Sequence, residues 1–264
     1  MIRPLIIGHR GASAIAPENT IAAFERALAC GADGIEFDVR LARDGVPVVI
    51  HDATLRRTAL RQGKVSSLSS NELVGIDVGA WFNLRHPSAA RPDHARATIP
   101  TLARVLELFG NSRLYVEMKC EGQEGAVLAA EVARLVRAYS LLERVVVESF
   151  DLDSIKEIKR IDPRIHTAAL FEPRLSRPRP APRKMIEQAV SCAADEIALH
   201  RTLATRRITE EAGRRGMGVV VWTVDSPSWV KRAISHGVYA LITNNPAKMR
   251  ARRDAIMGRQ ASRG

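Results

Sequence analysis

The chain has 264 residues, with 40 basic and 29 acidic side chains, so its formal net charge is 40 − 29 = +11. Hydrophobic residues make up 46% and charged residues 26%, which excludes a disordered chain or a fibre and supplies enough apolar material for a large core. The positive charge favours anionic ligands. No helix-turn-helix, zinc-finger or aromatic RNA-binding motif accompanies it, so we expect no nucleic-acid partner.

The cysteines and the hydropathy pattern bear on location. Cys30, Cys120 and Cys192 are scattered without metal-binding or redox spacing, which is typical of proteins from reducing compartments. The first residues do not resemble a secretory signal, and no segment approaches the ~20 apolar residues of a membrane span. We therefore expect a cytoplasmic protein with no stable membrane association, and a homo-oligomer is left open.

Short apolar runs typical of β-strands alternate with amphipathic helical stretches along the chain. This alternation predicts a parallel sheet, and eight strands at this length predict a TIM (β/α)8 barrel over residues 1–250. A doubly wound sheet is the alternative, but no glycine-rich nucleotide-binding fingerprint follows the first strand. The predicted strands are residues 5–8, 34–39, 114–119, 145–149, 167–171, 196–199, 219–223 and 240–243.

A ninth strand-like run, residues 46–51, follows the second strand too closely for a crossover helix. Asp44-Gly45 is a turn signal, so the two runs are predicted to form a hairpin. A turn centred near residue 44 would place His51 opposite Phe37 and therefore beside Glu36 and Asp38.

Three segments depart from the barrel pattern. Residues 54–98 predict a small subdomain inserted between the second strand and its helix at 102–108. Residues 177–184 are basic and proline-rich, which is typical of a stiff connector and would also suit an electropositive flank for an anionic substrate. Residues 251–264 predict a helix end followed by a basic C-terminal tail.

Acidic residues concentrate where the predicted strands end. Strand alternation places Glu36 and Asp38 on one face, and Glu117 ends the next strand of the barrel. Buried carboxylates repel one another unless a cation lies between them. These three residues could bind a hard divalent ion such as Mg²⁺ or Ca²⁺, or each could pair with an arginine.

Two histidines and two cationic residues occupy the same predicted edge. His9 ends the first strand and His51 ends the hairpin, and imidazoles suit proton transfer in either direction. Arg10 and Lys119 together favour an oxyanion, of which phosphate fits best. Gly11 would let the backbone approach such a ligand closely.

Several segments carry a more specific signal. They resemble, in order and over residues 3–250, the glycerophosphodiester phosphodiesterase family. The resemblance implies a TIM barrel with a small inserted domain and hydrolysis of glycerophosphodiesters to glycerol 3-phosphate and an alcohol. The segments are His9-Arg10-Gly11-Ala12-Ser13, Ala16-Pro17-Glu18-Asn19-Thr20, Glu36-Phe37-Asp38, residues 45–58, Glu117-Met118-Lys119, Glu148-Ser149-Phe150, residues 221–224 and residues 242–246.

The resemblance also implies roles for individual residues. It assigns His9 and His51 to acid–base catalysis, Glu36, Asp38 and Glu117 to the divalent metal, and Arg10 and Lys119 to the phosphate. Trp222, Phe150 and His200 are further candidates for substrate binding at the mouth. The chain departs from the family pattern at Tyr239-Ala240 and at Asn244, where aspartate is common.

Two other functions are compatible with the same residues. A lysophospholipase D-type activity on lipid phosphodiesters would need a more apolar mouth, for which Trp81 and Phe82 of the insertion are candidates. A protein that binds a phosphate ligand without catalysis would not need a pair of histidines.

Overall fold

The computed structural model describes residues 3–120, 124–173 and 181–261. Its strands form one sheet in which eight parallel strands close into a barrel through pairing of the first strand with both the second and the last. The TIM-barrel prediction is therefore confirmed. The barrel strands are β1 (Leu5–His9), β2 (Gly34–Leu41), β4 (Arg113–Met118), β5 (Val145–Ser149), β6 (His166–Phe171), β7 (Glu196–His200), β8 (Gly218–Trp222) and β9 (Ala240–Thr243).

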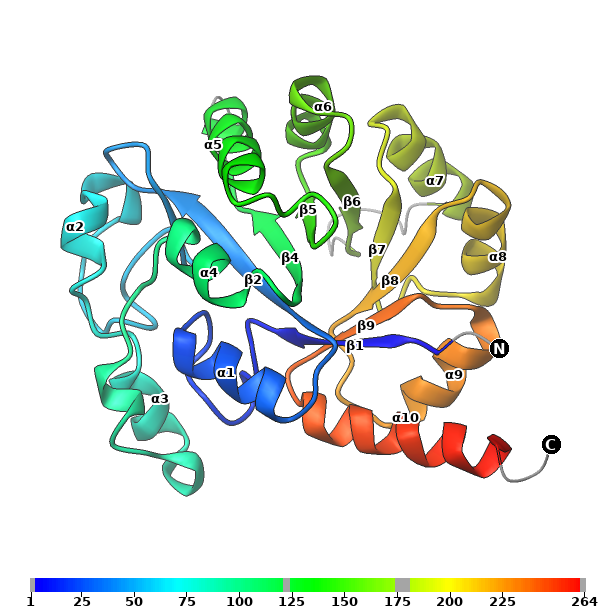
Figure 1. The fold of residues 1–264 in the computed structure, drawn as a ribbon, viewed down its shortest axis with the longest axis horizontal. Coiled ribbons are helices and arrows are strands. Elements are labelled where there is room, and N and C mark those ends of the chain that lie inside the picture. The colour runs from blue at the N-terminus through cyan, green and yellow to red at the C-terminus, as the bar shows by residue number, and fades with distance from the viewer. Residues whose placement is uncertain (1–2, 121–123, 174–180, 262–264) are drawn as a thin grey trace.

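Helices connect the strands and lie outside the barrel (Figure 1). Several begin at a threonine whose hydroxyl accepts a backbone N–H bond in the first turn, namely Thr20, Thr101 and Thr205. The helices are α1 (Ile21–Ala29), α4 (Leu102–Phe109), α5 (Glu124–Ala138), α6 (Leu152–Ile161), α7 (Pro182–Ser191), α8 (Arg206–Arg214), α9 (Ser228–His236) and α10 (Pro246–Ala261).

The additional strand, β3 (Pro47–Val49), lies outside the ring and pairs antiparallel with β2. Val39 faces Val49 and Leu41 faces Pro47, so the hairpin is centred on residue 44 as the turn signal predicts. Gly45 adopts a φ of 78°, which glycine tolerates at this turn. This register returns the chain to the carboxyl end of β2, where His51 follows.

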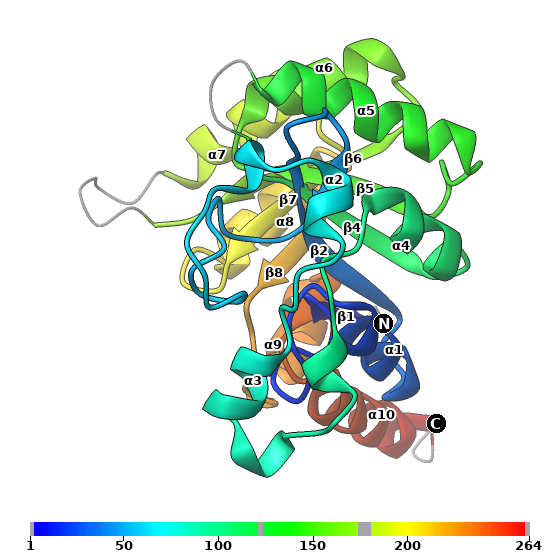
Figure 2. The same cartoon turned by 90° about the vertical axis from the view of Figure 1, so that its left-hand side faces the viewer.

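Between β3 and α4 the chain forms short helices on one side of the barrel, near β2 and α1 (Figure 2). Leu73 and Ile76 join a separate core cluster beneath them. Trp81 and Phe82 lie outside that cluster and pack against His86. The elements are η1 (Val65–Ser67), α2 (Ser70–Leu73), α3 (Ala80–Arg85), η2 (Pro87–Ala89) and η3 (His94–Arg96).

The core has two layers. Ile35, Phe37 and Val39 of β2 belong to the larger cluster, which packs the barrel against its helices. The barrel interior holds a smaller cluster in which Tyr115 lies among alanine and branched side chains. At the amino-terminal end of the barrel, the Tyr115 hydroxyl donates to Glu196 at 3.0 Å. This contact lies below the cavity at the carboxyl ends of the strands, and a separate open pocket of about 600 Å³ lies at the amino ends, where Arg113, His166 and Glu196 line it.

The structure describes only part of the other two segments that depart from the barrel pattern, the basic proline-rich loop and the C-terminal tail. Residues 177–180 of the basic proline-rich loop lie outside the described residues, and Pro182–Lys184 belong to the first turn of α7. Residues 251–261 continue α10, and the last three residues of the chain are also outside the description. The buried Arg253 ties this helix to the barrel through an ion pair with Asp33.

Candidate active site

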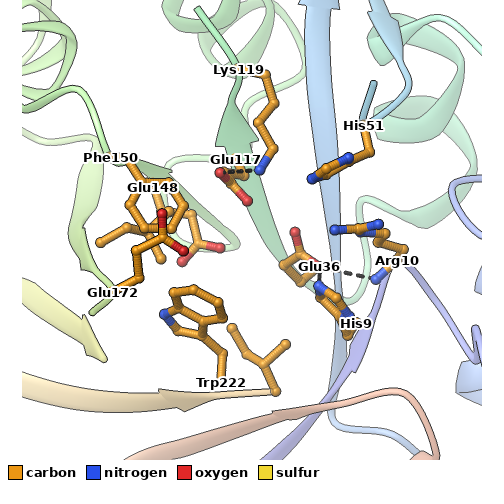
Figure 3. Close-up of a pocket in the computed structure, with 12 residues that line it drawn as sticks. His9, Arg10, Glu36, His51, Glu117, Lys119, Glu148, Phe150, Glu172 and Trp222 are labelled. Carbon is orange, nitrogen blue, oxygen red and sulfur yellow. Dashed lines mark hydrogen bonds and ion pairs between the residues drawn. The ribbon is translucent and has the colours of Figure 1, made fainter. Parts of the chain in front are cut away.

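A cavity of about 460 Å³ opens at the carboxyl ends of the strands (Figure 3). The two histidines and Arg10 lie on one side of it, the aromatic side chains lie on the other, and carboxylates lie between them. It is lined by His9, Arg10, Glu36, His51, Glu117, Lys119, Glu148, Phe150, Leu170, Glu172, Trp222 and Ile242.

Strand alternation and register bring the acidic residues together. Glu36 and Asp38 alternate with the apolar outer face of β2, and Asp38 pairs in register with Glu117 on β4. Glu117 in turn pairs with Glu148 on β5. All four side chains are buried, so the barrel holds four carboxylates near one end of its interior.

Asp38 is the carboxylate with the most partners. One of its oxygens lies 3.1 Å from Arg10 Nε and accepts from the Asn19 amide at 2.8 Å, and the other lies 3.2 Å from Lys119 Nζ. Burial acts to raise its pKa, but Arg10 and Lys119 outweigh burial and hold the pKa of Asp38 far below its usual range. Asp38 is therefore an anion that fixes both predicted phosphate-binding cations.

Glu36, Glu117 and Glu148 form a different group. Each offers one oxygen, and these oxygens lie within 4.8 Å of one another. Burial, followed by the neighbouring carboxylates, raises the pKa of Glu117 to about 7 and the pKa values of Glu36 and Glu148 well above the usual range. A divalent cation would offset the burial of these carboxylates and the repulsion between them. Carboxylates are hard oxygen donors of the kind that Mg²⁺ and Ca²⁺ prefer.

His9 is held by one hydrogen bond, at 2.7 Å between its Nδ1 and Asn244 Oδ1. The Asn244 amide is oriented because its nitrogen donates to Asp225 at 2.8 Å, and a carboxylate only accepts. Nδ1 of His9 therefore carries the proton, and Nε2 keeps its lone pair. Burial and then Arg10 lower the pKa of His9 to about 4, so the ring is neutral at physiological pH.

His51 has a different partner. Its Nδ1 donates to Asp52 at 2.6 Å, and Arg57 holds the same carboxylate from the other side at 2.7 Å. The backbone carbonyl of His51 accepts from Arg40 at 2.7 Å, which fixes the end of the hairpin. Burial lowers the pKa of His51, while the charge of Asp38 and the Asp52 hydrogen bond oppose this effect.

The turn after β1 presents Arg10 to the cavity. Arg10 and Gly11 both have positive φ, 54° and 84°. A Cβ on Gly11 would lie 2.5 Å from the backbone of Ala23 in α1. The close approach of helix α1 therefore explains the glycine at position 11. The sequence had suggested the close approach of a ligand instead.

The aromatic candidates line the opposite wall. Phe150 and Trp222 meet edge to face with ring centroids 5.5 Å apart, and both line the cavity. His200 lies beside Trp222 at 5.3 Å and is not a lining residue. Eight of the ten predicted site residues therefore line the cavity. Asp38 does not line it but forms ion pairs with Arg10 and Lys119, which do, and His200 contacts Trp222.

The chain matches the model of the glycerophosphoryl diester phosphodiesterase family over residues 9–248. The chain belongs to this family. Among curated relatives, a glycerophosphodiester phosphodiesterase of Caldanaerobacter subterraneus subsp. tengcongensis is 33% identical over 249 residues, covering 93% of this chain and 96% of the relative. One of Bacillus subtilis is 31% identical, covering 92% and 84%.

Solved structures agree. A glycerophosphodiester phosphodiesterase from Agrobacterium tumefaciens is 29% identical and superposes with a TM-score of 0.76 over 94% of this chain and 99% of that one. A Silicibacter pomeroyi structure, 27% identical, gives a TM-score of 0.84 over 97% and 94%. The family and its curated relatives identify this chain as a phosphodiesterase. Among its described residues, no helix is long and apolar enough to cross a membrane.

Some residues that line the cavity of this phosphodiesterase, or that contact its lining from outside, were not singled out from the sequence. Glu148 precedes a predicted site residue by two positions on the same strand face, so alternation alone could have indicated it. Glu18 and Arg57 lie in segments that carried the resemblance, but their ion pair at 2.7 Å joins distant parts of the chain. Nothing local to either residue signals that contact.

Proposed function

We propose that this phosphodiesterase hydrolyses glycerophosphodiesters to glycerol 3-phosphate and an alcohol such as choline or ethanolamine, by metal-dependent acid–base catalysis in the cavity. The observation that carries the proposal is the pair of histidines, each with Nδ1 hydrogen-bonded to a half-buried side-chain oxygen, beside Arg10, Lys119 and a cluster of carboxylates. A site that only binds phosphate would not need two imidazoles positioned in this way.

His9 is the general base in this proposal. Its proton is fixed on Nδ1 and its lowered pKa keeps Nε2 free to accept a proton at neutral pH. The proton comes from the nucleophile, which is water or the neighbouring hydroxyl of the glycerol group. In the second case a cyclic phosphate forms and water then opens it.

His51 is the general acid. Asp52 accepts a hydrogen bond from Nδ1–H of His51 and would stabilise the imidazolium. Arg57 keeps Asp52 ionised with a pKa of about 2. A protonated Nε2 can then donate to the leaving alkoxide. The stronger anionic support behind His51 than behind His9 is the physical reason for this assignment.

Arg10 and Lys119 would bind the non-bridging phosphate oxygens, because Asp38 holds both cations at the mouth. Glu36, Asp38 and Glu117 would hold the divalent metal, as the family resemblance implies. The unpartnered buried oxygens of Glu36 and Glu148 fit such a cation. When bound, it would neutralise charge that develops on the phosphate.

The apolar mouth that a lysolipid would need has less support. Trp81 packs in the insertion with its indole N–H donating to Val78, Phe82 is buried, and neither lines the cavity. Phe150 and Trp222 are the aromatic groups that a substrate would meet, and they suit a small alcohol group. We therefore propose glycerophosphodiesters as the substrates, with lysophospholipids as the comparison.

The remaining sequence expectations stay proposals. Residues 54–98 would form the inserted subdomain, whose Arg57 supports His51 through Asp52. The three cysteines are free, which supports a reducing, cytoplasmic location. A small anionic phosphodiester is the expected partner.

The test is incubation of the full chain with glycerophosphocholine, glycerophosphoethanolamine and lysophosphatidylcholine, with glycerol 3-phosphate or the released alcohol as readout. We expect turnover of the two glycerophosphodiesters, its loss in EDTA and its recovery with Mg²⁺, Mn²⁺ or Ca²⁺. Undiminished turnover in chelator would refute the metal role. Turnover of the lysolipid alone would refute the substrate proposal.

A further inference from the structure

Arg57, in the segment between β3 and η1, binds two carboxylates at once. Its Nη1 and Nη2 donate to the two oxygens of Glu18 at 2.7 and 2.8 Å. Its Nε and Nη2 donate to the two oxygens of Asp52 at 2.7 and 3.2 Å. Paired bonds of this kind use the planar fork of a guanidinium group, which a lysine ammonium cannot reproduce. All three nitrogens of the Arg57 guanidinium are therefore engaged by carboxylates.

Glu18 connects Arg57 to the phosphate-binding side of the cavity. The Glu18 oxygen that accepts from Arg57 Nη2 also accepts from Arg10 Nη1 at 2.9 Å. The Glu18 side chain is only 12% exposed. Burial acts to raise the pKa of Glu18, but the hydrogen bonds from Arg57 and the charge of Arg10 outweigh burial and lower it. Glu18 is therefore an anion that is held by Arg57 on one side and by Arg10 on the other.

Asp52 connects Arg57 to the general acid. The Asp52 oxygen that accepts from Arg57 Nη2 also accepts from His51 Nδ1 at 2.6 Å. His51 and Arg10 line the cavity, whereas Arg57 does not. One guanidinium group is thus separated by a single carboxylate from each of two cavity residues, which come from different turns of the chain.

Another arginine near the insertion forms a simpler contact. Arg43 pairs with Glu72 at 3.2 Å, and the two side chains are 59% and 50% exposed. Neither residue lines the cavity, and exposed pairs of this kind contribute little to stability. The two carboxylates that Arg57 binds are more buried, and each of them accepts a hydrogen bond from a cavity residue. The contacts of Arg57 are therefore directed at the site.

We propose that Arg57 is a positioning residue that holds the phosphate-binding Arg10 and the acid His51 in one fixed geometry. It acts on Arg10 through Glu18 and on His51 through Asp52. A fixed spacing between the two groups keeps the leaving alkoxide of a bound phosphate near the proton that it receives. The inference rests on the roles of Arg10 and His51 in the proposed function, and it gives a part in the reaction to a residue outside the cavity.

The first experiment compares kcat and KM of Arg57→Ala on two substrates at saturating Mg²⁺. On glycerophosphocholine, kcat should fall about tenfold or more, because Asp52 loses the charged hydrogen bonds that orient it behind His51. KM should rise about threefold or more, because Glu18 no longer holds Arg10 firmly. On a glycerophosphodiester with a nitrophenol leaving group, kcat should recover because no acid is needed, while KM stays raised.

Arg43→Ala is the matched control, because Arg43 also joins the hairpin of β2 and β3 to the insertion. Its kcat and KM should stay within about twofold of the native values on both substrates, as expected for an exposed ion pair.

Added guanidinium ion, below denaturing concentrations, should partly restore kcat in Arg57→Ala, since the Arg57 side chain is 39% exposed and its place can be reached from solvent. It should not raise kcat in the native protein or in Arg43→Ala. Arg57→Lys keeps the charge but not the fork, so its kcat should lie between those of Arg57→Ala and the native protein.

Combined variants test which carboxylate transmits each effect. Asp52→Asn should lower kcat, and Glu18→Gln should raise KM. Adding Arg57→Ala to Asp52→Asn should change kcat by less than about twofold, and adding it to Glu18→Gln should change KM by as little, because residues that act through one another are not additive. Effects that multiply in full would overturn the inference.

A folded Arg57→Ala protein with native kcat and KM would also overturn it. So would an equal loss of kcat on both substrates with unchanged KM, which is the result expected if Arg57 only stabilises the fold.

The affinity for glycerol 3-phosphate, measured by calorimetry, separates this inference from the proposed function. We expect the dissociation constant to rise about threefold or more in Arg57→Ala, and not in Arg43→Ala. Unchanged affinity in Arg57→Ala would overturn the inference even if the native chain hydrolysed glycerophosphodiesters. Affinity that depends on Arg57, in a native chain that releases no glycerol 3-phosphate from any diester, would support the inference and refute the proposed function. A native chain that neither binds nor releases glycerol 3-phosphate would overturn both.

Discussion

Replacing Asn244 with aspartate should restore the basicity of His9. Oδ1 of Asn244 lies 2.7 Å from His9 Nδ1, so a carboxylate there would face the imidazolium at about 4 Å between charge centres. At an effective dielectric of about 20 that interaction is worth about 4 kcal/mol, or roughly three pH units. Asp225, 2.8 Å from the Asn244 amide nitrogen, would oppose the new charge and reduce the effect.

We therefore expect the pKa of His9 to rise from about 4 to roughly 6 in Asn244→Asp. The assay is kcat/KM for glycerophosphocholine between pH 4.5 and 9 at saturating Mg²⁺, where the acidic limb reports the free enzyme's base. The limb should move to higher pH by about two units, so that activity falls below pH 6 while activity at pH 8 is kept.

Asn245→Asp is the matched control. It adds the same charge one residue away, at a side chain that caps α10 by accepting from the Lys248 N–H at 3.1 Å, a position that aspartate tolerates. Its acidic limb should stay where the native limb is. A folded Asn244→Asp protein with an unshifted limb would refute the assignment of His9 as the titrating base.

Three further predictions use other parts of the structure. His9→Ala and His51→Ala should each lower kcat by about 10²–10⁴-fold. The kcat of His51→Ala should recover on a glycerophosphodiester with a nitrophenol leaving group, because that leaving group needs no general acid. Equal recovery of kcat in both variants would refute the division of roles. In EDTA the unfolding temperature should fall as pH rises from 5 to 8. The pKa of Glu117 is about 7 in the folded chain and 4.5 in the reference state, so folding favours its protonated form. That stabilisation is fully present below pH 4.5 and is lost as pH rises through 7, which lowers the free energy of unfolding by roughly 3 kcal/mol. Mg²⁺ should therefore raise the unfolding temperature more at pH 8 than at pH 5, and a rise independent of pH would contradict the carboxylate cluster. Gly11→Ala should lower the unfolding temperature, because its Cβ would lie 2.5 Å from the Ala23 backbone, and a native melting curve would contradict that packing.

Much of the fold follows from local pattern. Strand alternation and turn chemistry are local, so the eight strands and the hairpin centred on residue 44 could be predicted to within a few residues. The hairpin alone placed His51 beside β2, since register follows from the position of the turn. The packing of the insertion could not be predicted equally well, because Trp81 and Phe82 pack against His86 rather than against the Leu73 cluster.

The site could be predicted where residues follow strand ends. His9, Glu36 and Glu117 needed only a barrel with its strands in order, because parallel strands end at one edge. The hydrogen-bond partners could not be predicted in this way. Asn244 is 235 residues from His9 in sequence, and only the closure of β1 against β9 brings the two together.

A ³¹P NMR spectrum of glycerophosphocholine incubated with the protein and Mg²⁺ shows directly which bond of the diester is cleaved. We expect the diester resonance to be replaced by that of glycerol 3-phosphate, and to persist when the histidine at position 9 or 51 is replaced by alanine. A diester resonance that persists with the folded, metal-loaded native protein would contradict the account, as would its replacement by phosphocholine.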